Sequence, residues 1–87
     1  MYKILYEERV YKDLDVIPNR DLEKIDKIFQ ALPLNPRPHG CAKLKGNYDY
    51  YRIRQGRYRI IYTINDSENI ITVLSVRHRK DVYRGLN

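Results

Sequence analysis

Residues 50–63, with the sequence YYRIRQGRYRIIYT, constrain the fold of this chain more than any other segment. Apolar and cationic residues alternate on both sides of Gln55-Gly56, a pattern typical of two antiparallel strands joined by a two-residue loop. A loop at this position pairs Arg52 with Arg59. Because side chains alternate across a strand, the hairpin has an apolar face and a cationic face. The apolar face holds Tyr51, Ile53, Tyr58 and Ile60, and the cationic face holds Arg52, Arg54, Arg57 and Arg59.

The cationic face needs a physical explanation, because like charges directly opposite one another destabilise a strand pair. A solvated outer face is one explanation. An anionic cover is the other, and it is favoured because the charges on this face all have one sign. The chain carries 17 Lys and Arg against 11 Asp and Glu, a net charge of +6, which promotes binding to polyanions or to an acidic protein. We predict that the polyanion is RNA.

The segments around the hairpin predict a small α+β domain. Residues 2–6 (YKILY) predict a strand that is apolar enough to be central in a sheet, and residues 70–76 (IITVLSV) predict another. Residues 7–16 and 20–32 show the helical period, with Asn19 as the expected cap of the second helix. The expected order is β-α-α-β-β-β, a helical hairpin packed on a mostly antiparallel sheet of about four strands. The helical stripes hold Val10, Leu14 and Ile17, and then Leu22, Ile25, Ile28, Phe29 and Leu32.

The polar turn NDSEN sets the predicted pairing of the last two strands. With this turn as a loop, Tyr62 faces Thr72, and Ile61 and Val73 fall on the cationic side of the sheet. That side is therefore partly apolar and needs a cover. A short C-terminal helix over residues 80–86, or a partner protein, would supply it.

Composition excludes several classes of protein. Eighty-seven residues form one small domain, residues 1–87. Cys41 is the only cysteine, so no intrachain disulfide and no Cys-based metal site is expected, and we predict no metal and no cofactor. Residues 33–40 hold three prolines and predict a connector, in which His39 is structural or idle. The chain begins MYKILYEE, without the apolar core of a signal peptide, and no segment has the length of a membrane span, so we expect a cytoplasmic protein.

The tail RHRKDVYR, residues 77–84, carries a second cationic cluster. Because the last strand is expected to pair beside the hairpin, Arg77 emerges near its Arg57–Arg59 end. Cleavage of RNA requires a base for the 2′-OH, cations for the phosphorane and an acid for the leaving 5′ oxygen. His78 is a candidate base or acid, or a plain surface residue; Tyr83 is a candidate for base stacking or proton steering, or a cap on the core. The predicted RNA-binding residues are Lys43, Lys45, Arg57, Arg77, Lys80 and Arg84.

Over nearly its whole length the sequence resembles the RelE toxins of the RelE/ParE superfamily. The resemblance rests on KLKG, a tyrosine strand with alternating cations, RYRIIY, and a strand ending SVRHRKDVYRGL. RelE toxins of type II toxin–antitoxin systems enter the ribosomal A site and cleave the mRNA there, by 2′-OH attack without metal, leaving a cyclic phosphate. The resemblance implies the same fold and activity for this chain, and thus inhibition of translation.

The resemblance also assigns roles to individual residues. The two alternating strand cations fall on Arg52 and Arg54, where the best-known member has lysines. Lysine can act as a general base when its pKa is depressed, but arginine in practice does not lose its proton, so His78 is our candidate base instead. The family's transition-state arginine falls on Arg59, its leaving-group arginine on Arg79 and its C-terminal tyrosine on Tyr83.

The resemblance further implies partners. A small acidic antitoxin would wrap the basic sheet, and the chain would meet operator DNA only through the antitoxin's DNA-binding part. Two other functions stay open: a ParE-like gyrase inhibitor that cuts nothing, and an RNA-binding member without turnover. ParE-like chains tend to lack the full catalytic set, so the presence of that set here favours the nuclease.

Overall fold

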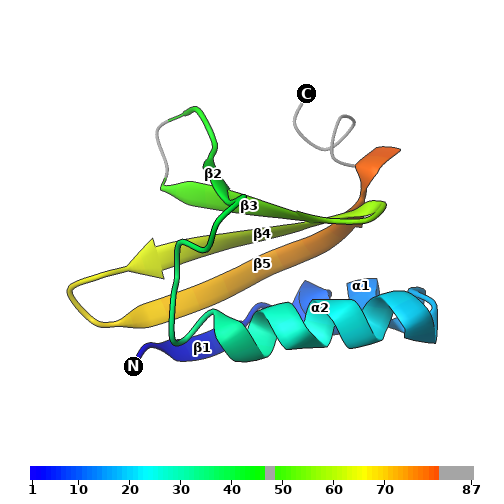
Figure 1. The fold of residues 1–87 in the computed structure, drawn as a ribbon, viewed down its shortest axis with the longest axis horizontal. Helices are drawn as coiled ribbons and strands as arrows, with labels where there is room; N and C mark the ends of the chain where they lie inside the picture. The colour runs from blue at the N-terminus through cyan, green and yellow to red at the C-terminus, as the bar shows by residue number, and fades with distance from the viewer. Residues whose placement is uncertain (47–48, 81–87) are drawn as a thin grey trace.

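A computed structural model describes residues 1–46 and 49–80 of the chain (Figure 1). These residues form two helices, α1 (Glu8–Asp15) and α2 (Asn19–Ala31), and five strands, β1 (Lys3–Tyr6), β2 (Ala42–Lys43), β3 (Tyr50–Gln55), β4 (Tyr58–Asn65) and β5 (Ile70–His78). The predicted α+β class is confirmed. The sequence did not predict β2, because two residues are too few to show a strand period. The helix predicted over residues 80–86 lies, apart from Lys80, outside the described residues.

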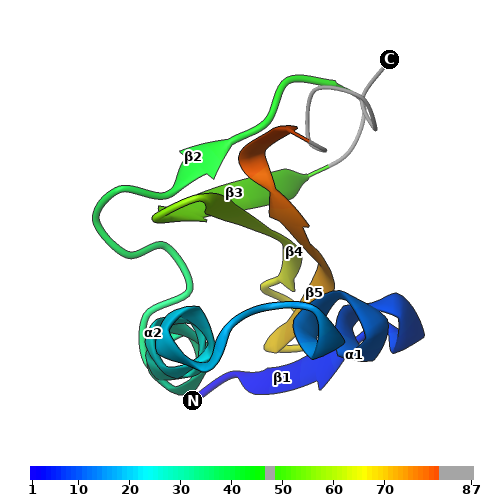
Figure 2. The same ribbon diagram turned by 90° about the vertical axis from the view of Figure 1, so that its right-hand side faces the viewer.

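The strands form one sheet in the order β1-β5-β4-β3-β2. β1 runs parallel to β5, and the other neighbours are antiparallel. The prediction of a central first strand is wrong, because β1 lies at the edge of the sheet. Its apolar run has another cause: Ile4 and Tyr6 pack against the core, while Lys3 and Leu5 are exposed. Figure 2 shows β2 at the end of the sheet that lies farthest from the helices.

Both helices bury their apolar stripes in one core against one face of the sheet. Val10 of α1 and Ile25 of α2 are almost fully buried, which confirms the predicted stripes. The predicted cap is wrong: Asn19 is the first residue of α2, Pro18 precedes it in extended backbone, and no side chain caps the helix. Neither helix in the described part of the chain is long and apolar enough to span a membrane. The sheet contributes Tyr51, Ile53, Ile60, Tyr62, Ile64, Ile71, Val73 and Val76 to the core.

The loop of the central hairpin lies one residue later than predicted. Gln55 pairs with Tyr58, so the loop is Gly56-Arg57. Gly56 has φ +59°, and the first position of a two-residue hairpin loop needs a positive φ that glycine adopts without cost. Arg59 therefore pairs with Arg54, and the predicted pairing of Arg59 with Arg52 is wrong. Arg57, predicted on the cationic face, lies in the loop instead. The other residues are on the predicted faces, because moving the loop by one residue shifts the pairing by two.

The pairing of β4 with β5 contains a β-bulge, which the sequence did not predict. Ile61 pairs with Ser75, but Tyr62 pairs with Val73, so one extra residue, Leu74, lies between them. The predicted pairing of Tyr62 with Thr72 is therefore wrong. Val73 is fully buried in the core, and its predicted place on the cationic side is also wrong.

Candidate nucleic-acid interface

Three arginines lie in one line across the face of the sheet that points away from the helices. Arg54 of β3 pairs with Arg59 of β4, and Arg59 pairs with Arg77 of β5. Each alternates with a residue that packs in the core on the opposite face, such as Ile53 and Ile60. We call Arg54, Arg59 and Arg77 the arginine row. Arg77 was predicted as part of the RNA-binding surface. In the structure it lies directly beside Arg59, the predicted transition-state arginine.

Arg54 and Arg77 have no ion pair with a described residue. The ion pairs between described residues join Arg9 to Asp13, Arg37 to Asp66 and Lys43 to Asp49. Within residues 1–46 and 49–80, no carboxylate lies within 4.0 Å of the guanidinium of Arg54 or Arg77. Arg59 donates from Nη1 to the carbonyl oxygens of Gly56 and Tyr58, at 3.1 and 2.9 Å, which holds its side chain at the hairpin loop. The two ends of the row therefore present positive charge that no described carboxylate offsets.

Arg52 lies on the same face, one pair further along β3. It pairs with Ile61, and Ile61 pairs with Ser75. Its Nε is buried and has no hydrogen-bond partner among residues 1–46 and 49–80. A buried donor without an acceptor destabilises a protein by about 1–3 kcal/mol. A ligand atom that accepted a hydrogen bond from this Nε would remove that destabilisation.

His78 and Arg79 lie where β5 leaves the sheet. His78 pairs with Tyr58, and their rings meet edge to face with centroids 5.6 Å apart. Because Tyr58 packs against the core, strand alternation places His78 on the face opposite to Arg77. The backbone N–H of Arg79 donates to the carbonyl of Arg57 at 2.7 Å. The predicted convergence of the two basic segments is confirmed for the arginine row, whereas His78 lies behind it.

The remaining predicted site residues do not belong to the arginine row. Lys43 pairs with Tyr51 and lies opposite in face to Arg52, and its Nζ binds the Asp49 carboxylate at 2.9 Å. That hydrogen bond raises the pKa of Lys43 and offsets its charge. Lys45, Arg57 and Lys80 are exposed. Tyr83 and Arg84 lie outside the described residues. In the described part of the chain, no group of three or more His, Cys, Asp or Glu side chains is placed to hold a metal ion.

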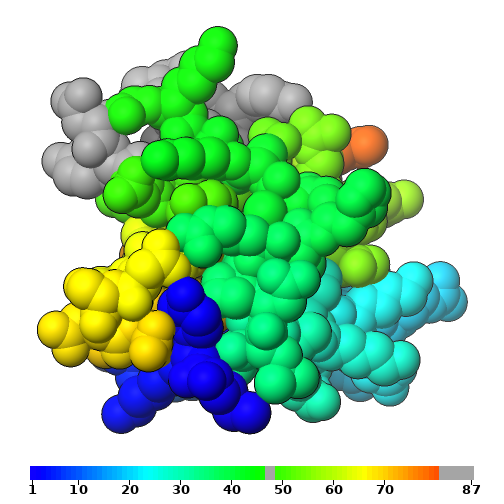
Figure 3. Space-filling model, turned by 60° about the vertical axis from the view of Figure 1, so that its left-hand side comes forward, coloured from blue at the N-terminus to red at the C-terminus, as the bar shows by residue number. Residues whose placement is uncertain are grey.

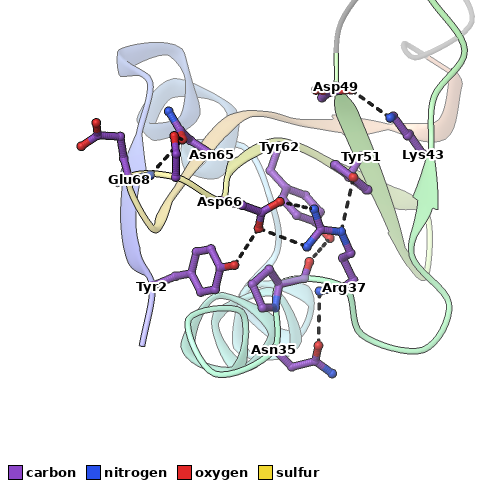
Figure 4. A network of polar contacts seen from close by, with 12 residues as sticks. Tyr2, Asn35, Arg37, Lys43, Asp49, Tyr51, Tyr62, Asn65, Asp66 and Glu68 are labelled. Carbon is purple, nitrogen blue, oxygen red and sulfur yellow. Dashed lines mark hydrogen bonds and ion pairs between the residues drawn. The ribbon is translucent and has the colours of Figure 1, made fainter.

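A polar network that the sequence did not predict ties the proline-rich connector to the sheet (Figure 4). Arg37 binds both carboxylate oxygens of Asp66, at 3.3 and 2.8 Å, and its guanidinium lies 5.3 Å from the ring centroid of Tyr51. Tyr2 donates its hydroxyl to Asp66 at 2.6 Å. Hydrogen bonds from Arg37 and Tyr2 lower the pKa of Asp66. We call Tyr2, Arg37, Tyr51 and Asp66 the connector network.

The connector network has a structural role. Tyr62, fully buried beneath it, donates its hydroxyl to the carbonyl of Pro36 at 2.7 Å, and burial raises the pKa of this phenol. In Figure 3 the N-terminus (blue), the connector (green) and the turn between β4 and β5 (yellow) meet on one surface. The network therefore closes the core at the end of the sheet remote from the hairpin loop.

The fold and this face define a class: small domains in which two helices cover one side of a sheet and the bare side carries a line of cations. Residues 4–83 match the family model described as ParE toxin of type II toxin-antitoxin system, parDE. The chain therefore belongs to this family of type II toxins, within the RelE/ParE superfamily.

Individual relatives carry RelE names. The chain is 34% identical over 85 residues to toxin RelE3 of Methanocaldococcus jannaschii, covering 93% of this chain and 94% of that protein. It is 29% identical over 84 residues to toxin RelG of Mycobacterium tuberculosis, covering 95% and 97%. Its fold is similar to that in the archaeal RelE–RelB complex from Pyrococcus horikoshii OT3, with a TM-score of 0.81 at 29% identity, over 90% of this chain and 94% of that chain. For the RelB–RelE antitoxin–toxin complex from Methanococcus jannaschii the TM-score is 0.79 at 30% identity, over 95% and 99%. The resemblance to RelE toxins is confirmed.

Proposed function

We propose that this toxin is an endoribonuclease that cleaves mRNA in the ribosomal A site and thereby inhibits translation. The observation that carries the proposal is the arginine row, three guanidinium groups in adjacent cross-strand positions on the face of the sheet opposite to the helices. Such a line costs stability unless an anion covers it, and the fork of donors on each guanidinium matches phosphate oxygens.

In the proposed reaction the 2′-OH of one nucleotide gives its proton to water and attacks the adjacent phosphate, the bond from phosphorus to the 5′ oxygen breaks, and that oxygen takes a proton from water, which leaves a cyclic phosphate and a 5′-hydroxyl. Arg59, in the centre of the row, stabilises the doubly charged phosphorane, with Arg54 and Arg77 on its two sides. Arg52, on the same face one pair further along β3, adds a further cation. Arg79 and Tyr83 keep the roles near the leaving group that the resemblance implies. None of these arginines accepts a proton, so orientation of the substrate by the ribosome carries a large share of the rate.

The test is translation of a defined mRNA in a purified system, with 5′ ends mapped by primer extension. The parent is expected to give cuts at A-site codons. Arg59→Ala and Arg77→Ala are expected to give none, and Lys27→Ala is the control, because Lys27 is an exposed cation in the middle of α2. Cuts that persist in Arg59→Ala would refute the assignment. Intact mRNA with retained RNA binding would instead indicate a member that binds RNA without turnover.

We also propose that a cognate acidic antitoxin neutralises the protein. The solved structures from Pyrococcus horikoshii and Methanococcus jannaschii are RelE complexes with RelB, and the net charge of +6 favours an acidic partner here. The antitoxin would cover the bare sheet face and carry the pair to operator DNA. The ribosome and its mRNA are then the targets of the free toxin, which places its action in the cytoplasm.

A second candidate function is inhibition of DNA gyrase. It is favoured by the match of residues 4–83 to a model described by a ParE toxin. A supercoiling assay with purified gyrase distinguishes the two, because the nuclease leaves supercoiling unchanged. Blocked supercoiling together with intact mRNA would replace the first proposal by the second.

A further inference from the structure

His78, the last residue of β5, holds the helical residues Arg79 and Lys80 that follow it. The Nδ1 atom of His78 accepts a hydrogen bond from the backbone N–H of Lys80 at 3.3 Å. This is the contact by which an Asn or Asp side chain caps a helix or closes an Asx-turn, from residue i to the N–H of residue i+2. The preceding N–H, that of Arg79, donates to the carbonyl of Arg57 in the hairpin loop. Two successive N–H groups are thereby fixed just beyond the arginine row.

The ring of His78 is held in place for this contact. Tyr58 lies opposite it in the sheet, with the two rings edge to face at 5.6 Å, and both side chains are half-buried. An imidazole whose Nδ1 accepts a hydrogen bond is neutral, with its proton on Nε2. The register also places this ring on the face opposite to Arg59 and Arg77. Both observations are unfavourable to proton transfer by His78 at a phosphate on the arginine row.

We propose that His78 is a positioning residue, whose neutral ring caps the turn at Arg79–Lys80 and so fixes Arg79 beside the arginine row. The proposal rests on the proposed nuclease function and replaces the acid–base role that the sequence predicted for His78. Because the register puts the ring on the face opposite to Arg59 and Arg77, its effect on cleavage would act through the backbone that it holds at Arg79 and Lys80.

The variants His78→Asn and His78→Ala test the proposal in the cleavage assay. Asparagine places an oxygen where Nδ1 lies, so it keeps the cap but transfers no proton near neutral pH. His78→Asn is expected to cleave within about twofold of the parent. His78→Ala is expected to be about fivefold slower, a factor that corresponds to about 1 kcal/mol, the usual contribution of a cap. The control is His39→Asn, at the exposed histidine of the connector, which should cleave as fast as the parent.

Each result that would contradict the proposal contradicts a different part of it. If His78→Asn is as slow as His78→Ala, or if His78→Ala cleaves as fast as the parent, the positioning role is wrong. A second readout does not depend on cleavage: hydrogen exchange at the Lys80 amide should be faster in His78→Ala than in the parent and His78→Asn. If no protein cleaves but this exchange pattern holds, the proposed nuclease function fails while the turn stands. Equal exchange in all three proteins would overturn the cap itself.

Discussion

The arginine row makes a prediction about stability that opposes the usual effect of mutation. Arg77→Gln removes one end of the row but keeps most of the half-buried stem of the side chain. The guanidinium of Arg77 makes no hydrogen bond or ion pair with a described residue. The substitution therefore removes the repulsion between Arg77 and the other arginines of the row without removing a polar contact to a described residue. We expect the variant to be more stable than the parent and less able to bind RNA.

The size of the gain follows from the spacing of the strands. Neighbouring strands lie about 4.8 Å apart, and long side chains that splay put their charges at roughly 7 Å. Two unit charges at about 7 Å in water repel by roughly 0.6 kcal/mol, which agrees with the cost of about 0.2–1 kcal/mol for like charges opposite one another. Arg54, two strands away at roughly 10 Å, adds about 0.4 kcal/mol. The expected gain is therefore about 1 kcal/mol at low salt.

Urea denaturation in 10 mM and 1 M NaCl measures this gain. The Debye length falls from about 30 Å to about 3 Å between these concentrations, so the gain should nearly vanish at high salt. At low salt the expected rise in melting temperature is about 4–8 °C. Lys27→Gln, with the same change in net charge on the exposed side of α2, is the control and should change stability by less than about 0.5 kcal/mol.

Two results would refute the reasoning. If Arg77→Gln is less stable than the parent at 10 mM NaCl, the side chain contributes packing that outweighs its repulsion. If the gain is the same at 1 M NaCl, its cause is not electrostatic. In either case the arginine row would no longer imply an anionic ligand, and the strongest physical support for the nuclease proposal would be lost.

Three further predictions concern the parts of the fold that support this face. Because the pKa of Asp66 is lowered in the folded protein, its contribution to stability is present at neutral pH and is lost as pH falls below the usual carboxylate pKa of about 4 and through the lowered pKa. Asp66→Asn should be less stable at pH 7, and its melting temperature should depend less on pH in the acid range. Tyr62→Phe leaves the carbonyl of Pro36 without its donor and should cost about 1–2 kcal/mol in urea denaturation. Asp13→Ala leaves the N–H of Val76 unpaired and should cost about 1–3 kcal/mol in the same assay, whereas an effect under about 0.5 kcal/mol would show that water replaces the carboxylate.

Local rules were sufficient for the helices and for the faces of the hairpin. The apolar stripes of α1 and α2 follow from spacing alone, and Val10, Ile25 and Phe29 are buried as predicted. Apart from Arg57, which lies in the loop, the hairpin faces were predicted correctly from a wrong loop, because an error of one residue in the loop moves the pairing by two and leaves the strand side chains on their faces. The residue paired with Arg59 was predicted wrongly, because the pairing depends on the position of the loop.

The contact between the proline-rich connector and the sheet was beyond sequence reasoning. Arg37 and Asp66 are 29 residues apart, and nothing in the composition of the connector indicates that its arginine binds the turn between β4 and β5. β1 was predicted as a central strand because Ile4 and Tyr6 are apolar. It lies at the edge, beside β5, and buries these two side chains against the core from there.

The bulge in β5 shows how one such feature sets the composition of the site. Beyond the bulge, towards residue 70, Tyr62 pairs with Val73. Had this pairing continued unbroken, Tyr58 would face Arg77, and Arg77 would lie on the core face of the sheet. The extra residue, Leu74, shifts the pairing by one, so that Val76 enters the core and Arg77 meets Arg59 on the bare face. The N–H of Val76, next to Arg77, donates to the Asp13 carboxylate of α1 at 3.0 Å. The pairing of Arg77 with Arg59 thus depends on a local irregularity, which is why the sequence predicted Arg77 near this end of the hairpin but not its partner.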